Sequence, residues 1–211
     1  VGTRPNLIKI TQLEKCFRQY PSIEYKLLHT GQHYDYNMND IFFQQLGVKP
    51  PDVFLNINQG SQVDVIGQIM QKFEEFVLAY KPDLVMVPGD VNSSFACAFV
   101  ASRNNIPVAH IESGLRSFDK TMPEEVNRVL TDHLSDLLLC PSELAAFNLK
   151  KENIQGKDKI IISEDIMLDC LLHFLPQSIF KNYFPENSKQ TYILGTLHRA
   201  ENTSNKNVLK E

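Results

Sequence analysis

Short apolar runs alternate with amphipathic segments along most of the chain. This alternation is typical of βαβ units built around a parallel sheet. It predicts strands at Tyr25–Thr30, Leu84–Val87, Ile106–Ile111, Leu137–Cys140 and Ile160–Ile162. It predicts helices at Leu7–Tyr20, from Val63 to about Lys81, and at Ser93–Asn104, Glu124–Ser135 and Glu143–Lys151, the last capped by Ser142. The expected fold class is therefore α/β with a parallel sheet.

The composition changes after the last predicted strand. Residues 175–190 are rich in Pro, Asn, Ser and Lys and have no periodicity, which predicts a linker. A new strand is predicted at Thr191–Gly195, and Asn202-Thr203-Ser204 is typical of a helix start. We therefore expect one domain over residues 1–174 and the opening of a second α/β domain over residues 191–211. Since the chain starts on a turn and stops inside that second unit, we expect a piece of a longer protein.

The composition is that of a globular protein, with 43% hydrophobic residues, 22% charged residues and a formal net charge of −4. Lys and Arg are scattered, which argues against nucleic acid or an anionic membrane surface as partners. No apolar run approaches the roughly 20 residues of a membrane-spanning helix. The four cysteines are far apart and form no CxxC pair, so thiols in a reducing, cytoplasmic compartment are expected.

Polar side chains follow the carboxyl ends of the predicted strands or precede the next helix. In open parallel sheets, ligands bind outside these strand ends, beside helix N-termini that favour anionic groups. We therefore expect a binding site on this rim. The polar positions on it are Arg4, Gln32 with His33, Asp90, Glu112, and His198 with Arg199.

Each of the acidic candidates also has a structural interpretation. Asp90 could cap the helix that begins near Ser93, and capping and catalysis are equally compatible with its position. Glu112 ends an apolar strand, so its carboxylate is either desolvated, as suits general acid or base catalysis, or open to a cleft. The cation Lys9 lies near a helix start, where the dipole disfavours it; taken alone it is a solvated lysine, and a phosphate contact would explain why the cost is tolerated.

Glu124 and Glu125 are adjacent on a predicted helix, so their side chains diverge by about 100° and cannot face one atom. Acids favour the first helical turn, and Glu124 could pair with Arg128 one turn on. Decoration of the helix start is the default interpretation of both. The histidines His29 and His133, together with His173, are expected to be structural.

Several catalytic motifs are absent from the sequence. The turn Gly2-Thr3-Arg4-Pro5 is not a G-x-G-x-x-G fingerprint, so a nicotinamide or flavin cofactor is unsupported. This segment is either a plain strand-to-helix turn with Pro5 at the first helical position or, as we favour, a phosphate contact through the turn amides and Arg4. The histidines lack H-E-x-x-H spacing, so no metal site is predicted. No G-x-S-x-G or Cys/His signature supports an acyl-enzyme.

Seven blocks along the chain stand together in an order that one enzyme family shares. They are Gly2-Thr3-Arg4-Pro5 with Ile8-Lys9, Thr30-Gly31-Gln32-His33, Pro88-Gly89-Asp90, His110-Ile111-Glu112-Ser113-Gly114-Leu115-Arg116-Ser117, Pro123-Glu124-Glu125-Val126-Asn127-Arg128, Asp132-His133-Leu134-Ser135-Asp136 and Thr196-Leu197-His198-Arg199-Ala200-Glu201-Asn202. In these blocks the chain resembles the non-hydrolysing UDP-N-acetylglucosamine 2-epimerases, although Asn6 stands where the family usually has Glu. The resemblance implies a glycosyltransferase-B-type fold, in which two Rossmann-like domains with helices on both sheet faces enclose a UDP-sugar. This chain would supply the first domain.

The resemblance also implies a reaction. UDP-N-acetylglucosamine would be inverted at C2 to UDP-N-acetylmannosamine through anti elimination of UDP to a 2-acetamidoglucal and re-addition, without a cofactor. Asp90, Glu112, Glu124 and His198 would be catalytic, and the face of C2 on which each carboxylate acts stays open. Substrate contacts would come from Arg4, Lys9, Arg128, Arg199, Glu201 and Asn202.

Further expectations follow from the same resemblance. Gln32 and His33 would contact a second, regulatory UDP-N-acetylglucosamine, and the protein would be a homodimer. The alternatives are a 2-epimerase of another UDP-2-acetamido sugar, a glycosyltransferase on the same fold, and a remnant without activity.

Overall fold

The computed structural model of the chain describes residues 1–31, 43, 45–57, 59–154, 156, 159–177 and 195. The chain divides into two compact units, Val1–Leu175 and Pro176–Glu211. The helices and strands below belong to the first unit, and a short 3₁₀ turn, η1 (Leu175–Gln177), lies at its end. Apart from Gly195, the predicted strand at residues 191–195 and the predicted helix start after it lie outside the described residues.

Parallel strands form the centre of the first unit. β1 (Leu28–His29) pairs with β2 (Val53–Phe54) in a two-stranded sheet. A four-stranded sheet follows chain order, with β3 (Val85–Pro88), β4 (Val108–Ile111), β5 (Leu137–Cys140) and β6 (Ile160–Ile162). Because adjacent parallel strands need a crossover, a helix follows each of β3, β4 and β5. The predicted parallel α/β class is confirmed.

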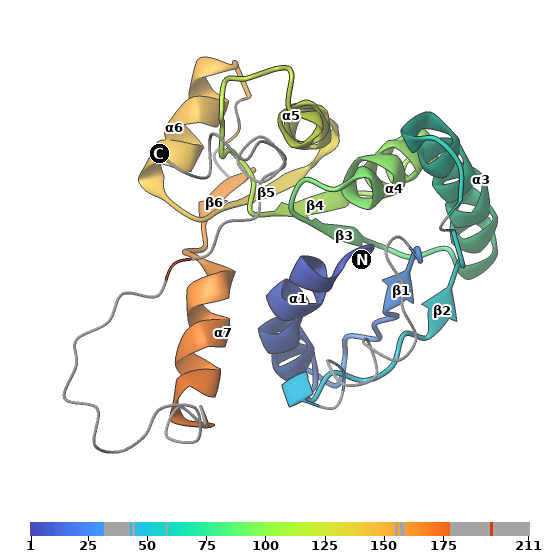
Figure 1. Ribbon diagram of the computed structural model, residues 1–211, viewed down its shortest axis with the longest axis horizontal. Helices are drawn as coiled ribbons and strands as arrows, with labels where there is room; N and C mark the ends of the chain where they lie inside the picture. Colours follow the sequence, from blue (N-terminus) through green and yellow to red (C-terminus); the bar gives the residue numbers. More distant parts are fainter. Residues whose placement is uncertain are drawn as a thin grey trace. The chain divides into compact units, whose positions relative to one another are not determined.

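Helices lie on both faces of the four-stranded sheet (Figure 1). Three of them, α3, α4 and α5, follow one another along one face, while α1 and α7 pack together on the other. The bounds are α1 (Arg4–Phe17), α3 (Gln62–Tyr80), α4 (Asn92–Arg103), α5 (Pro123–Leu134), α6 (Glu143–Lys151) and α7 (Ile166–Phe174). All except α7 lie within a few residues of a predicted helix; α7 and β2 were not predicted.

Local side chains fix where several helices begin. Ser61 and Asp64 form a reciprocal capping box at the start of α3. Ser142 accepts the Ala145 N–H at the start of α6, as the sequence predicts. In the same way, Asp165 accepts the Met167 N–H at the start of α7. These caps satisfy backbone donors that the first helical turn leaves unpaired.

The main hydrophobic core packs α3 and α4 onto β1, β3 and β4. Ile69, Phe73 and Val77 line one face of α3 at helical spacing and are almost fully buried. Burial of each such side chain contributes about 1.5–3 kcal/mol. A smaller core under α6 contains Leu138 and Leu149. Together these cores hold the strands rigidly, and the loops that leave the strand ends are therefore well placed for a site.

Candidate functional site

The turn after β3 brings an acidic side chain to the sheet rim. In Pro88-Gly89-Asp90, Gly89 has a φ of 66°, a conformation that favours glycine. A Cβ atom there would lie 2.7 Å from Lys9 Nζ, so a side chain at this position would also displace that ammonium group. Asn6 Nδ2 donates to the Pro88 carbonyl over 3.1 Å, which ties the turn to the start of α1.

The turn after β4 brings the second acid to the same place. Glu112 has a φ of 68°, a left-handed conformation that costs a non-glycine residue about 1–2 kcal/mol. Its Oε2 atom forms an ion pair with Lys9 Nζ from α1, and both side chains are mostly buried. Backbone strain of this kind is common at functional sites, where it aims a side chain.

Arg128 of α5 joins the two acids. Its Nη2 atom lies 2.6 Å from Asp90 Oδ2 and 3.7 Å from Glu112 Oε1, and 12% of its side chain is exposed. Asn127 holds the Asp90 backbone by donating from Nδ2 to its carbonyl over 3.0 Å. Lys9, Asp90, Glu112 and Arg128 thus form one group of two acids and two cations, which we call the rim cluster.

Two structural interpretations of these residues are wrong. The N-cap of α4 is Val91, so Asp90 is not the helix cap; its carboxylate binds Arg128 instead. Arg128 likewise forms its ion pairs with Asp90 and Glu112, rather than the predicted pair with Glu124 one turn earlier. Glu124 itself is exposed in the first turn of α5 and takes part in none of the ion pairs given for the described residues.

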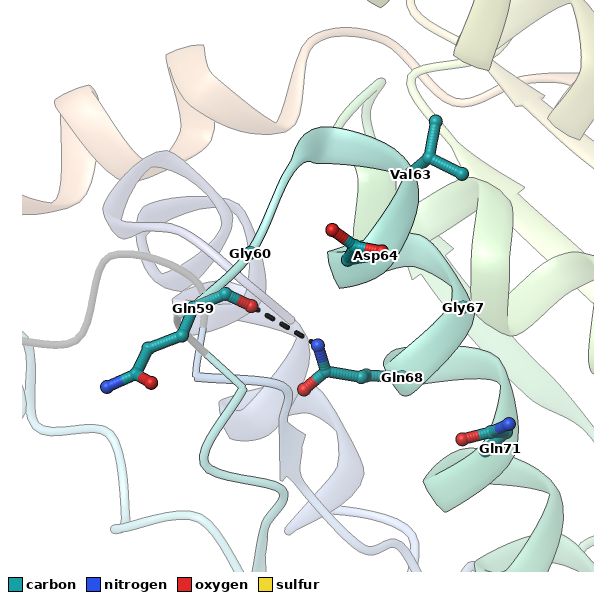
Figure 2. Close-up of a pocket in the computed structure, with 7 residues that line it drawn as sticks. All are labelled: Gln59, Gly60, Val63, Asp64, Gly67, Gln68 and Gln71. Atoms are coloured by element: carbon teal, nitrogen blue, oxygen red, sulfur yellow. Dashed lines mark hydrogen bonds between the residues drawn. The ribbon is translucent and has the colours of Figure 1, made fainter.

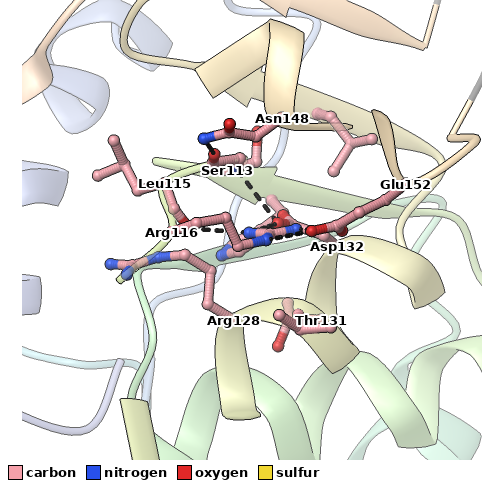
Figure 3. A network of polar contacts seen from close by, with 12 residues as sticks. Ser113, Leu115, Arg116, Arg128, Thr131, Asp132, Asn148 and Glu152 are labelled. Atoms are coloured by element: carbon pink, nitrogen blue, oxygen red, sulfur yellow. Dashed lines mark hydrogen bonds and ion pairs between the residues drawn. The ribbon is translucent and has the colours of Figure 1, made fainter. Parts of the chain in front are cut away.

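A buried network of four titratable side chains lies behind the rim cluster, and Figure 3 shows it around Arg116, Asp132 and Glu152. Asp132 is fully buried; Oδ1 lies 2.6 Å from His110 Nδ1, and Oδ2 accepts from Arg116 Nη1 over 2.7 Å. Arg116 also donates twice to Glu152, each time over 2.7 Å. We call His110, Arg116, Asp132 and Glu152 the buried network.

Charge complementarity makes this burial tolerable. Desolvation alone would raise the pKa of Asp132, but hydrogen bonds and charge interactions with His110 and Arg116 outweigh it and hold the pKa below its usual value. Burial alone would lower the pKa of Arg116, but its hydrogen bonds and charge interactions with Glu152 and Asp132 raise it. Asp132 therefore stays an ionised acceptor in the interior.

Glu125 is not a surface residue, and its side chain serves the loop before α5. Only 4% of it is exposed. Its carboxylate accepts the backbone N–H groups of Ser117 and Phe118 over 2.8 and 3.1 Å, as well as the Ser117 hydroxyl over 3.0 Å. Glu125 thus fixes the loop that follows the second acidic turn.

The remaining predicted site residues cannot be placed from the described part of the structure. The side chain of Arg4 lies outside the described part of the structure, as do the residues Gln32, His33, His198, Arg199, Glu201 and Asn202. Their roles stay predictions. Two of the histidines expected to be structural make such contacts: His29 is buried and accepts the Gly31 N–H, and His133 donates to the Val129 carbonyl.

Two hollows lie elsewhere in the first unit. Figure 2 shows the first, a shallow one of about 500 Å³ at the start of α3, where Gln68 donates to the Gln59 carbonyl over 3.2 Å. The second is a groove of about 680 Å³ between β1 and β3, lined by apolar side chains such as Leu28, Phe73 and Val85. Neither is lined by a residue of the rim cluster.

The remaining chemistry of the described residues is limited. They contain no group of three or more His, Cys, Asp or Glu side chains able to hold a metal ion. The four cysteines carry free thiols, and burial raises the pKa of Cys97 to about 12. No helix within the described ranges is long and apolar enough to cross a membrane.

The fold and the rim cluster define a parallel α/β protein with acids and cations gathered at the strand carboxyl ends, the usual ligand position in such sheets. A family model described as UDP-N-acetylglucosamine 2-epimerase matches residues 15–211. The chain belongs to this family.

Individual relatives agree with this assignment. A UDP-N-acetylglucosamine 2-epimerase homolog of Methanococcus maripaludis is 47% identical over the whole chain, which covers 59% of that relative. A UDP-2,3-diacetamido-2,3-dideoxy-D-glucuronate 2-epimerase of Pseudomonas aeruginosa is 43% identical over 96% of the chain and 57% of its own length. The crystal structure of Methanocaldococcus jannaschii UDP-GlcNAc 2-epimerase in complex with UDP-GlcNAc and UDP superimposes with a TM-score of 0.87, at 42% identity, covering 99% of this chain and 58% of that one. The chain thus spans a little over half the length of these relatives.

Proposed function

We propose that the complete protein inverts C2 of UDP-N-acetylglucosamine to give UDP-N-acetylmannosamine. The observation that carries this proposal is the convergence of Asp90 and Glu112, from two different strand ends, on Arg128. Family membership and the resemblance to a structure in complex with UDP-GlcNAc and UDP support the same substrate. Inversion needs acids and bases for a carbon-bound proton and cations for a departing diphosphate, and the rim cluster offers both.

The proposed reaction is an elimination followed by an addition. A carboxylate removes the proton from C2, a double bond forms between C1 and C2, and the C1–O bond breaks with its electron pair leaving on UDP. UDP then re-adds at C1 while C2 receives a proton on the opposite face. Asp90 and Glu112, with Glu124 as the third acid, are the proposed proton carriers.

The ion pairs of the rim cluster suit this sequence of steps. Lys9 and Arg128 neutralise the two acids in the structure described here. A bound diphosphate would compete for the same two cations and would thereby free the carboxylates to accept a proton. The cations would then stabilise the charge that develops on the leaving diphosphate.

Solvent exchange tests the proposal. The complete protein is incubated in D₂O with UDP-N-acetylglucosamine, and we expect deuterium at C2 together with the 2-epimer. Glu112→Gln should lower the rate at least about 100-fold, whereas the matched change at an exposed acid of α6, Glu143→Gln, should leave it unchanged. Turnover without deuterium at C2 would rule out the proton-transfer mechanism.

A second substrate has a specific observation in its favour. The Pseudomonas aeruginosa relative, 43% identical, is a 2-epimerase of a UDP-2,3-diacetamido sugar acid. We propose such a UDP-2-acetamido sugar as the alternative substrate. A panel of UDP-sugars with different C3 and C6 substituents separates the two, because only the true substrate combines C2 exchange with efficient turnover. The regulatory role of Gln32 and His33 and the homodimer are further proposals, for which ligand titration and sedimentation are the tests.

A further inference from the structure

His110 lies inside the central sheet with two hydrogen-bond acceptors, one at each ring nitrogen. It belongs to β4, and no part of it is exposed. Nδ1 lies 2.6 Å from Asp132 Oδ1, and Nε2 lies 2.8 Å from the Gly89 carbonyl oxygen. A backbone carbonyl can only accept a hydrogen bond, and so can an ionised carboxylate. Both contacts are hydrogen bonds only if both ring nitrogens carry hydrogen.

Charge balance around the ring agrees with a doubly protonated imidazolium. Arg116, with 1% of its side chain exposed, lies on the far side of Asp132 and then binds Glu152. Charges then alternate in sign along the buried network, which ends at the partly exposed Glu152. Buried charges are tolerated when each has an opposite neighbour. A neutral ring would leave Nε2 or Nδ1 facing an acceptor without a hydrogen between them.

The ring connects the two acidic turns of the rim cluster. Gly89, whose carbonyl it holds, directly precedes Asp90 in the turn after β3. Asp132, its other partner, accepts the backbone N–H of Gly114 over 3.1 Å, and Gly114 comes two residues after Glu112. One pair of side chains therefore fixes the turn after β3 and the turn after β4 at the same time.

We propose that His110 is a positioning residue, a buried imidazolium that binds the Gly89 carbonyl and the Asp132 carboxylate together and so sets the position of Asp90 relative to Glu112. The effect of His110 on catalysis rests on the proposed epimerase function, whereas the protonation state of its ring is independent of that function. Misplacing a catalytic group by about 1 Å can cost about 100-fold in rate, so the alignment of two acids is sensitive to this link.

Nitrogen NMR of the complete protein, labelled with ¹⁵N in histidine, tests the protonation state directly. We expect one ring to show hydrogen on both nitrogens at pH 8, and we expect that pair of signals to disappear in His110→Gln. In Asp132→Asn, the ring should lose one of its two hydrogens because its anionic partner is gone. A ring at His110 with a single N–H in the unmodified protein overturns the proposal, whether or not any variant folds.

Kinetics test the positioning role. The two N–H groups of a glutamine side chain share one nitrogen, so they cannot match two acceptors that meet separate ring nitrogens of His110. His110→Gln should therefore lower kcat about 10–100-fold with KM changed less than about threefold. Glu152→Gln, at the other end of the buried network, is the matched control and should keep kcat. A folded His110→Gln protein with unchanged kcat overturns the positioning role. If the unmodified protein shows no C2 exchange at all, the proposed function fails, while the NMR result still decides the state of the ring.

Discussion

Replacing the buried side chain of Arg116 should destabilise the fold far more than replacing that of Glu152, its more exposed ion-pair partner. Arg116→Met deletes two hydrogen bonds to Glu152, one to Asp132 and one to the Leu115 carbonyl. It leaves the fully buried Asp132 carboxylate with only His110 and one backbone N–H as partners. Breaking a buried ion pair from one side costs about 3–5 kcal/mol. With a urea dependence of about 2 kcal/mol per molar, the unfolding midpoint should fall by about 1.5–2.5 M.

The matched variant is Glu152→Gln. A quarter of the Glu152 side chain is exposed, 27%, so solvent screens its interaction with Arg116 and takes over part of its hydrogen bonding. The expected loss is about 1 kcal/mol, or about 0.5 M in the urea midpoint. Urea unfolding of the complete protein followed by circular dichroism measures both variants. Equal midpoints for the two would refute the view that the buried charge of Asp132 depends on Arg116.

The pH dependence adds a second measurement to the same experiment. The folded pKa of Asp132 is below its usual value near 3.8, so the unfolded chain binds more protons as the solution becomes acidic. The stability from this group is therefore complete well above pH 3.8 and is lost as the pH falls through the folded pKa. In Arg116→Met one of the causes of the lowered pKa is missing, so the variant should lose less stability on acidification than the unmodified protein.

Three further changes test other parts of the structure. Gly89→Ala is strained at a φ of 66° and its methyl group would displace Lys9 Nζ, so the turn that carries Asp90 should shift and kcat should fall about 100-fold. Gly67→Ala, in open space on α3, should be neutral or stabilising, and equal kinetics for the two variants would contradict this argument. Arg128→Lys replaces a planar fork with a point charge and should lower kcat/KM at least about tenfold in steady-state assays, and an unchanged value would count against its bridging role. His29 has its pKa lowered from 6.5 to about 3, chiefly by burial, so stability should fall by about 1.4 kcal/mol for each pH unit below 6.5 down to about pH 3. Urea unfolding midpoints at pH 7 and pH 5 measure this loss of stability, and the loss should be smaller in His29→Gln. If the variant shows the same pH dependence as the unmodified protein, the loss arises from another group.

Much of the fold follows from local signals in the sequence. The predicted bounds of β5, α6 and β6 match the structure, because Ser142 marks the start of α6, Asp136 and Pro141 bracket β5, and Lys159 and Ser163 bracket β6. The helix α7 has no such pattern. In α7, Cys170 is buried, whereas Leu168 and Leu171 are more than half exposed. The apolar residues of this helix therefore form no buried stripe that helical periodicity could detect. The strand β2 is two residues long and too short for any alternation.

The candidate site divides in the same way between local and tertiary information. Asp90 and Glu112 can be found from the sequence because each follows an apolar strand. Their common partner Arg128 cannot be assigned locally: on the sequence it has an acid one helical turn away, and only the packing of α5 against the rim directs it to the two turns instead. Glu125 is hidden for the same reason, since acids in a first helical turn are usually exposed, whereas this one folds back onto a loop.

The two charged groups differ in how their charges could be used. The side chains of the rim cluster are 10–22% exposed at the strand ends, so an anionic ligand that reaches them can take the place of a carboxylate in their ion pairs. In the buried network an exchange of partners would strand a charge in the interior, at a cost of several kcal/mol, so its geometry is fixed. His110 is the link between them, because its Nε2 atom meets the carbonyl just before Asp90 while its Nδ1 atom meets Asp132. In the proposed reaction the acids would change partners without changing position, and a rigid charged interior behind the rim cluster suits that proposal.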